Sequence, residues 1–279
     1  MPNKRFILGV GAQKAGTTWL YDYLARSGEV SMSKIKELHY FDAIYCPELL
    51  GKKQIEPIEK LKQRRIKDLK AGKTKPSRMS VELFKRIQMD FDDGAYIRYF
   101  QEIGRKSPVT GEITPSYSVI PAEGFRKIRS LLTSNGYDVR VVFLMRDPVE
   151  RVYSALRMAD RDVGTSRAFK GYFKALANDQ HVLRSRYDKT LANLRAAFKP
   201  EEIHTEFYES LFTNQAVKGI CDFLGISFKD PNFAVKKNAS AKTSDLDKAR
   251  IDAGIAAFRD VYDFAHREFG ARVPAEWHA

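Results

Sequence analysis

A short apolar segment that runs straight into a glycine-bounded loop constrains the fold of this 279-residue chain more than any other feature. The segment Phe6–Val10 is apolar and is followed by glycine, which is the pattern of a buried parallel strand. Beyond the loop Gly11–Thr18, apolar residues recur at helical spacing at Trp19, Leu20, Tyr23 and Leu24. The sequence therefore predicts a strand, a loop and an amphipathic helix in direct succession.

The loop has the residues of an anion site. Gly11 and Gly16 permit backbone angles that other residues avoid, and they let the main chain approach a ligand closely. Thr17 and Thr18 occupy the first helical turn, where backbone N–H groups have no partner within the helix. We expect the loop to bind a phosphate-like anion through Gln13, Lys14, Ala15, Gly16, Thr17 and Thr18. A turn that merely connects strand and helix is the alternative.

The two glycines have the spacing of the nucleotide-binding P-loop, G-x-x-x-x-G-K-[ST], but Thr17 stands where that motif has its lysine. The lysine of this loop is Lys14. An ATP or GTP enzyme also needs a metal-binding aspartate, and the sequence has no convincing strand that ends in one. A lysine inside the loop suits a ligand with one phosphate beside a second charged group, so a P-loop kinase is the less favoured alternative.

A second strand-to-helix junction lies in the middle of the chain. Val139–Met145 is another buried-strand pattern, and Arg146 stands at its carboxyl end. Asp147 and Glu150 have the spacing of a capping box, which places Ser154 about two turns into the following helix. Because ligands of open parallel sheets bind along the carboxyl edge, Arg146 is a candidate phosphate ligand. An arginine that pairs with a carboxylate at the start of the helix is the alternative.

Together these segments resemble the sulfotransferases that use 3′-phosphoadenosine 5′-phosphosulfate (PAPS). Gly11–Thr18 is similar to the 5′-phosphosulfate loop of that family, and Arg146–Ser154 resembles its 3′-phosphate motif, Arg-Asp-Pro-x-x-Arg-x-x-Ser. The likeness to the bacterial and heparan-sulfate-type branch continues in Lys36–Asp42, Gly111–Tyr117 and Phe207–Leu211. In order and spacing the motifs cover almost the whole chain.

The resemblance implies a PAPS-dependent transfer of a sulfuryl group, which needs a base near the acceptor and cations at the leaving oxygen. We assign Lys14 to the leaving group. By resemblance Glu37 is the base, and His39 is the alternative base. A glycan or lipid-linked saccharide is the expected acceptor, with a small hydroxyl compound as the alternative. The residues expected at the nucleotide and its 3′-phosphate are Arg146, Ser154, Tyr187, Lys236, Lys237 and Lys242.

One position departs from the family pattern. Where the related glycan sulfotransferases have a catalytic lysine after the glutamate of E-K-T-P, this chain has Ile113. Either Lys14 carries the charge of the leaving group with help from Lys34 or Lys36, or a residue elsewhere replaces the missing lysine.

The chain is strongly basic, with a formal net charge of +13. Such a charge favours anionic partners, here a nucleotide cofactor and an acidic acceptor. Nucleic acid also binds basic domains, but no nucleic-acid motif accompanies the charge, so we expect none as a partner. A non-catalytic basic binding protein is the alternative from a different functional class.

Other kinds of site find little support in the sequence. Cys46 and Cys221 give neither a disulfide framework nor a thiolate zinc site, and the five histidines lack metal-ligand spacing, so we expect no metal. No signal peptide precedes the first strand, and no apolar run reaches the roughly twenty residues of a membrane-spanning helix. We therefore expect a cytoplasmic, bacterial-type enzyme, and contact with a membrane surface stays open.

The remaining pattern predicts one α/β domain over residues 1–279, with a P-loop-like central parallel sheet flanked by helices. Residues 46–100 include a Lys- and Arg-rich insertion that is the candidate acceptor-binding region; a solvated basic face is the alternative. Further along, the sequence predicts a helix over Asp188–Phe198 and a strand over Ile203–Tyr208. A last long helix is expected over about Asp245–Phe269.

Overall fold

The computed structural model of the protein describes residues 4–49, 81–234 and 245–278, together with positions 63, 66, 67 and 70–72. The strands are β1 (Lys4–Gly11), β2 (Val30–Met32), β3 (Val109–Ile113), β4 (Tyr137–Met145) and β5 (Ile203–Phe207). The longer helices are α1 (Thr17–Ala25), α4 (Val81–Gln88), α5 (Ala95–Ile103), α6 (Ala122–Ser134), α7 (Pro148–Val163), α8 (Ala168–Leu176), α10 (Tyr187–Arg195), α12 (Asn214–Leu224), α13 (Lys248–Ala257) and α14 (Arg259–Phe269). Shorter helices are α2 (Phe41–Tyr45), α9 (Asp179–Leu183) and α11 (Tyr208–Leu211), and 3-10 turns lie at Pro47–Leu49, Pro115–Val119, Pro200–Glu202 and Gly270–Arg272.

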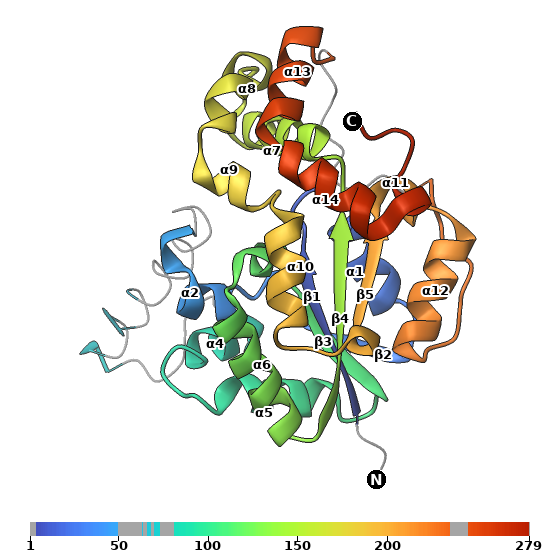
Figure 1. The fold of residues 1–279 in the computed structure, drawn as a ribbon. Coiled ribbons are helices and arrows are strands. Elements are labelled where there is room, and N and C mark those ends of the chain that lie inside the picture. Colours follow the sequence, from blue (N-terminus) through green and yellow to red (C-terminus); the bar gives the residue numbers. More distant parts are fainter. Residues whose placement is uncertain are drawn as a thin grey trace.

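The five strands form one parallel sheet in the order β2–β3–β1–β4–β5 (Figure 1). β1 lies in the centre, where Ile7 stands opposite Gly111 of β3 and Arg140 of β4. The chain builds β2 and β3 on one side of β1 and then β4 and β5 on the other. Ligands of open parallel sheets bind at such a switch point, outside the carboxyl ends of the strands, and the loop after β1 starts there.

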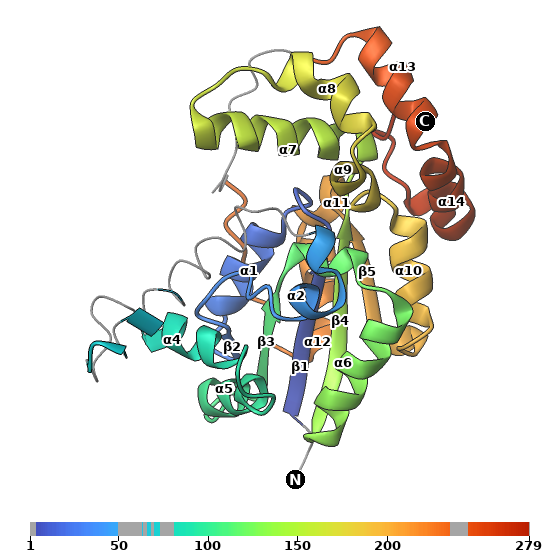
Figure 2. The same ribbon diagram turned by 90° about the vertical axis from the view of Figure 1, so that its left-hand side faces the viewer.

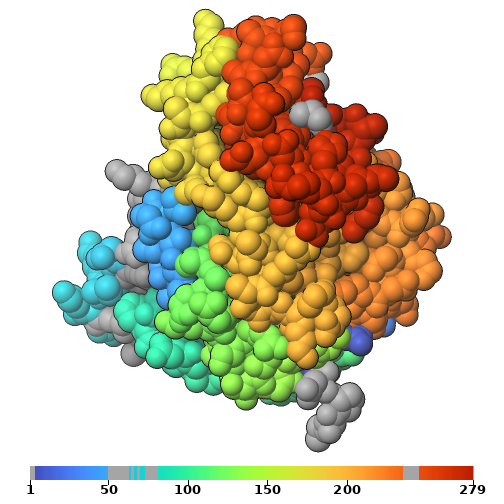
Figure 3. All heavy atoms as spheres, in the orientation of Figure 1, coloured from blue at the N-terminus to red at the C-terminus, as the bar shows by residue number. Residues whose placement is uncertain are grey.

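Helices cover the sheet on both faces, as predicted for an α/β protein. α6 and α10 lie on one face and α1 on the other (Figures 1 and 2). α7 and α8 lie beyond the carboxyl ends of the strands (Figure 2), and α14 packs over α10 (Figure 3). The expected central parallel sheet flanked by helices is therefore confirmed, and α7 spans the edge at which a ligand should bind.

Close packing between the central strands explains two residues of the Gly111–Tyr117 motif. A Cβ atom at Gly111 would overlap the backbone of Ile7, so only glycine fits between β3 and β1. Ile113 is 2% exposed and stands opposite Gly9, where a Cβ would lie 2.5 Å from the Ile113 side chain. Ile113 is thus a core residue, and a lysine amine at this position would have to be buried in the sheet.

Two local predictions differ from the structure, and a third lies mostly outside the described residues. The single helix expected over Asp245–Phe269 is two helices, because the backbone of the buried residue Phe258 leaves helical geometry between α13 and α14. The strand expected to end at Tyr208 ends at Phe207, and Tyr208 begins α11. Of the basic insertion, most of residues 50–80 lies outside the described residues; α4 and α5 are its described helices.

Candidate functional site

The loop after β1 presents an uncapped helix end. Gly16, the N-cap of α1, has a φ of 86°, and Lys14 has a φ of 71°, so the chain turns sharply before the helix. A Cβ at Gly16 would lie 2.7 Å from Leu211 Cδ2, which explains why glycine stands here. Within the described part of the chain, no side chain caps the first turn of α1. Its N–H groups are therefore available to an anion, as the sequence predicts.

The second junction lies against this loop. Arg146, directly after β4, donates from Nη1 to the carbonyl oxygen of Lys14 at 3.2 Å. Its Nη2 lies 3.4 Å from Glu150 Oε2, and its guanidinium lies 4.4 Å from the centre of the Tyr208 ring. Arg146 Nε is buried and has no hydrogen-bond partner among the described residues. The hydrogen bond to Lys14 joins the two motifs, which are separated by 132 positions in the chain.

The start of α7 is fixed by a network that only partly matches the expected capping box. The Asp147 side chain accepts a hydrogen bond from the Glu150 backbone N–H at 2.9 Å, as a helix cap should. The reciprocal half is absent, because the Asp147 N–H donates to Glu209 Oε1 at 3.1 Å instead. Tyr262 Oη also donates to Asp147, at 2.7 Å. Contacts from the C-terminal third of the chain therefore set the direction in which α7 leaves the sheet.

Lys14 lies among other cations. Burial is the main cause that lowers the pKa of Lys14 to about 8, and the charges of Arg161, Arg146 and Arg157 lower it further. Asp162 opposes this shift, as the smallest of the five named causes. An excess of positive charge at a partly buried place favours a bound anion, and it is typical of a site for a phosphorylated ligand.

Glu37 and His39 lie together in the segment after β2. His39 Nε2 is 3.7 Å from Glu37 Oε2, and His39 Nδ1 is 2.7 Å from Asp42 Oδ2. Ser116 Oγ donates to the same Asp42 oxygen and lies 3.2 Å from His39 Nδ1. Asp42 is fully buried and His39 is 8% exposed. Both Glu37 and His39 have a positive φ, so the backbone turns sharply at each of them.

The charges of this group can be assigned from the same contacts. Burial acts to raise the pKa of Glu37, but the hydrogen bond from His39 and the charge of Lys36 outweigh it and lower the pKa. Burial acts to lower the pKa of His39, but its hydrogen bonds to Asp42 and Glu37 raise the pKa to about 9. At neutral pH the pair is therefore a carboxylate beside an imidazolium. In this state Glu37 can accept a proton and His39 cannot.

Lys36 connects this group with the phosphate loop. Its Nζ donates to the Thr18 hydroxyl and lies 3.3 Å from Glu37 Oε1. Lys34 has a different position, because its Nζ lies 3.3 Å from Glu82 Oε1. Of the two lysines that could help Lys14, only Lys36 contacts the phosphate loop in the described structure, through the Thr18 hydroxyl.

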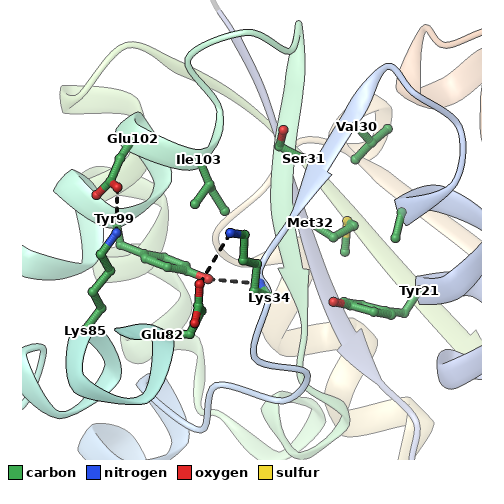
Figure 4. A pocket seen from close by; sticks show the side chains of 11 residues that line it. Tyr21, Val30, Ser31, Met32, Lys34, Glu82, Lys85, Tyr99, Glu102 and Ile103 are labelled. Carbon is green, nitrogen blue, oxygen red and sulfur yellow. Dashed lines mark hydrogen bonds and ion pairs between the residues drawn. The ribbon is translucent and has the colours of Figure 1, made fainter. Parts of the chain in front are cut away.

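Lys34 lines a separate cavity of about 480 Å³ at the edge strand β2 (Figure 4). Side chains of α4 and α5 form its other wall, where Lys85 Nζ lies 2.6 Å from Glu102 Oε1. Tyr99 Oη accepts a hydrogen bond from the Lys34 backbone N–H. The charged side chains that line this cavity are thus paired with one another.

The other predicted site residues differ in how deeply they are buried, and some lie outside the described part of the chain. Thr17 and Ala15 are buried in the loop, whereas Gln13 is half-buried. Ser154 lies on α7 and is 7% exposed. Tyr187 is fully buried and its hydroxyl donates to the Arg146 carbonyl at 2.7 Å, so its ring offers no surface to a nucleotide. Lys236, Lys237 and Lys242 lie outside the described residues.

Sequence reasoning gave no role to three side chains at this site. Asp42 and Ser116 hold His39, and they come from segments 74 positions apart. The His-x-x-Asp spacing is a weak signal for the first contact, and none exists for the second. Arg157 is the third, because an arginine in a basic helix has no distinguishing neighbours in the sequence.

The described part of the chain contains no cluster of three or more His, Cys, Asp or Glu residues that could hold a metal ion. Among its helices, none is both long and apolar enough to cross a membrane.

Comparisons with known proteins agree with this geometry. Residues 6–230 match the family described as "Sulfotransferase family". The fold is similar to a solved structure titled "Crystal Structure of Sulfotransferase from Alicyclobacillus acidocaldarius", with a TM-score of 0.65 and 19% sequence identity over 100% of this chain and 99% of that one. No curated protein matches the chain. The phosphate loop, the Glu37 segment and the start of α7 all lie within the matched residues.

Proposed function

Because the chain belongs to the sulfotransferase family, we propose that it transfers a sulfuryl group from PAPS to a hydroxyl or amine of an acceptor. The observation that carries this proposal is the hydrogen bond from Arg146 to the Lys14 carbonyl. It joins the two predicted anion-binding motifs at one edge of the sheet, which supports a donor with a 5′-phosphosulfate and a 3′-phosphate. The buried Nε of Arg146, which has no partner among the described residues, and the cations around Lys14 fit such a donor.

In this proposal the two motifs hold opposite ends of the donor. Arg146 and Ser154 bind the 3′-phosphate, and Tyr187 fixes the Arg146 backbone from beneath. The loop residues that bind the 5′-phosphosulfate are Gln13, Lys14, Ala15, Gly16, Thr17 and Thr18. Lys236, Lys237 and Lys242 stay predicted ligands of the 3′-phosphate.

The donor supplies an activated sulfuryl group. During transfer a new bond forms from the acceptor oxygen or nitrogen to sulfur, and the bond from sulfur to the 5′-phosphate oxygen breaks. Glu37 takes the proton of the acceptor, and the imidazolium of His39, held by Asp42, keeps the Glu37 carboxylate ionised beforehand. Lys14 and Lys36 face the charge that grows on the leaving phosphate oxygen.

We propose a glycan or lipid-linked saccharide as the acceptor, bound in part by the basic insertion of residues 46–100. The net charge of +13 supports an acidic acceptor. A small hydroxyl compound is the alternative, and the experiment below separates the two.

Transfer of labelled sulfate tests the proposal. The protein is incubated with ³⁵S-labelled PAPS and either cell-envelope glycans and lipid-linked saccharides or a panel of small phenols and alcohols, with Glu37→Gln as the inactive control. Label in the saccharide fraction supports the proposed acceptor, and label in the small compounds alone replaces it. Transfer of the γ-phosphate of ATP in the presence of Mg²⁺, with no transfer from PAPS, would contradict the proposed reaction.

A further inference from the structure

The helix α7 carries polar residues along one stripe well beyond the expected phosphate ligands. Glu150, Ser154, Arg157 and Arg161 follow one another at intervals of four, three and four positions, so they lie on the same side of the helix. The opposite side is apolar and buried through Val152 and Ala155. α7 runs beyond the carboxyl ends of the strands, above α1 (Figure 2). Its polar stripe therefore extends along the edge where the phosphate loop lies.

Arg157 is the unexplained member of this stripe. It is half-buried, and its Nε is buried without a hydrogen-bond partner among the described residues. Its guanidinium lies 4.9 Å from the centre of the Tyr153 ring, which holds the side chain against the helix. Within the described part of the chain, no ion pair joins Arg157 to a carboxylate, in contrast to Arg146 and Arg161. A buried N–H group without a hydrogen-bond partner is unfavourable, so a ligand that accepts this hydrogen bond would be stabilised by it.

The electrostatic effect of Arg157 on Lys14 indicates that its side chain lies near the phosphate loop. Its charge and that of Arg161 both reach Lys14, together with the charge of Arg146. Two of these arginines have a carboxylate beside them, because Arg146 lies 3.4 Å from Glu150 and Arg161 lies 3.1 Å from Asp162. Arg157 and Lys14 have no such neighbour within ion-pair distance among the described residues. These two cations are the uncompensated pair at the phosphate loop.

We propose that Arg157 binds the sulfuryl donor PAPS. Its guanidinium contacts the 5′-phosphosulfate from the side of α7, opposite the phosphate loop. This inference rests on the proposed function and names a residue that the loop and Arg146 motifs leave out. The ligand class is a phosphate or sulfate ester anion, which matches the planar fork of a guanidinium. Arg161, more exposed, adds charge but no direct contact. Arg157 would then supply the positive charge that related sulfotransferases have on a lysine at the position of Ile113.

Calorimetric titration of wild-type protein and Arg157→Gln with adenosine 3′,5′-bisphosphate and with AMP tests this assignment. AMP shares the 5′-phosphate and lacks the 3′-phosphate. Loss of a charged hydrogen-bond partner should weaken both ligands by a similar factor, about 10- to 100-fold. Lys174→Gln removes one positive charge from an exposed position on α8 and should leave both affinities within about twofold of wild type. Ser154→Ala should weaken the bisphosphate and leave AMP unchanged.

Arg157→Lys keeps the charge and loses the fork, so an intermediate loss is expected, and this variant also serves if Arg157→Gln does not fold. Affinities of Arg157→Gln that equal those of Lys174→Gln would overturn the inference, while bisphosphate binding by the wild type would leave the proposed function standing. A raised KM for the acceptor with unchanged bisphosphate affinity would overturn it as well, because Arg157 would then act on the acceptor. A wild-type protein that does not bind the bisphosphate would contradict the inference and the proposed function together.

Discussion

The imidazolium of His39 should make the stability of the fold depend on pH in a defined window. Burial alone would lower the pKa of His39, but hydrogen bonds to Asp42 and Glu37 raise it from the usual 6.5 to about 9. Because the folded-state pKa is the higher one, protonation stabilises the fold fully below about pH 6.5, and this contribution is lost as the pH rises through about 9. At roughly 1.4 kcal/mol per pKa unit, the contribution is about 3 kcal/mol.

Urea unfolding of wild-type protein and His39→Gln between about pH 6 and pH 10 measures this contribution. The difference in the free energy of unfolding between the two proteins should be largest at the acid end and should shrink by about 3 kcal/mol at the alkaline end. In His39→Gln, Asp42 also loses its cationic partner, which lowers the free energy of unfolding by an amount that does not change over this pH range. The test is therefore how the difference between the two proteins changes with pH. A difference that does not change with pH would show that His39 is neutral and would refute the assignment of charges to this group.

Three further predictions concern single side chains. Lys14→Met should lower turnover by about 100-fold or more while weakening bisphosphate binding less, as measured by steady-state kinetics and calorimetry, because the cation acts on the charge of the leaving group; a near-normal rate would place that role elsewhere. Glu37→Gln should bind adenosine 3′,5′-bisphosphate normally and lose roughly 10²–10⁴ in rate, whereas the same loss in His39→Asn with an active Glu37→Gln would move the base to His39. Tyr187→Phe removes the hydrogen bond to the Arg146 carbonyl and should lower the free energy of unfolding by about 1 kcal/mol; unchanged stability in urea would show that this bond is not formed.

Local patterns predicted the parts of the site that lie within one stretch of chain. The strand before the phosphate loop, the uncapped start of α1 and the position of Arg146 after β4 each depend on neighbours a few residues away. Their meeting at one edge follows from the parallel sheet, whose carboxyl ends lie together. A family-specific motif then supplied the Glu37 segment.

Contacts between distant segments could not be predicted in the same way. The Asp147 N–H is bound by Glu209 instead of Glu150, because α11 packs beside the start of α7. The long C-terminal helix is interrupted at Phe258 because this side chain is buried in the core. The helical spacing of apolar residues in the sequence does not indicate such an interruption. Ser116 joins His39 only through the fold. The choice between Lys34 and Lys36 as the lysine near the loop likewise required the structure.

Binding of adenosine 3′,5′-bisphosphate against AMP to the wild-type protein tests the central claim most directly. If Arg146 and Ser154 form one pocket with the loop around Lys14, the bisphosphate should bind and raise the melting temperature by mass action. AMP should raise it much less, because the 3′-phosphate side of the pocket stays empty. Equal stabilisation by the two nucleotides, or none by either, would contradict the account.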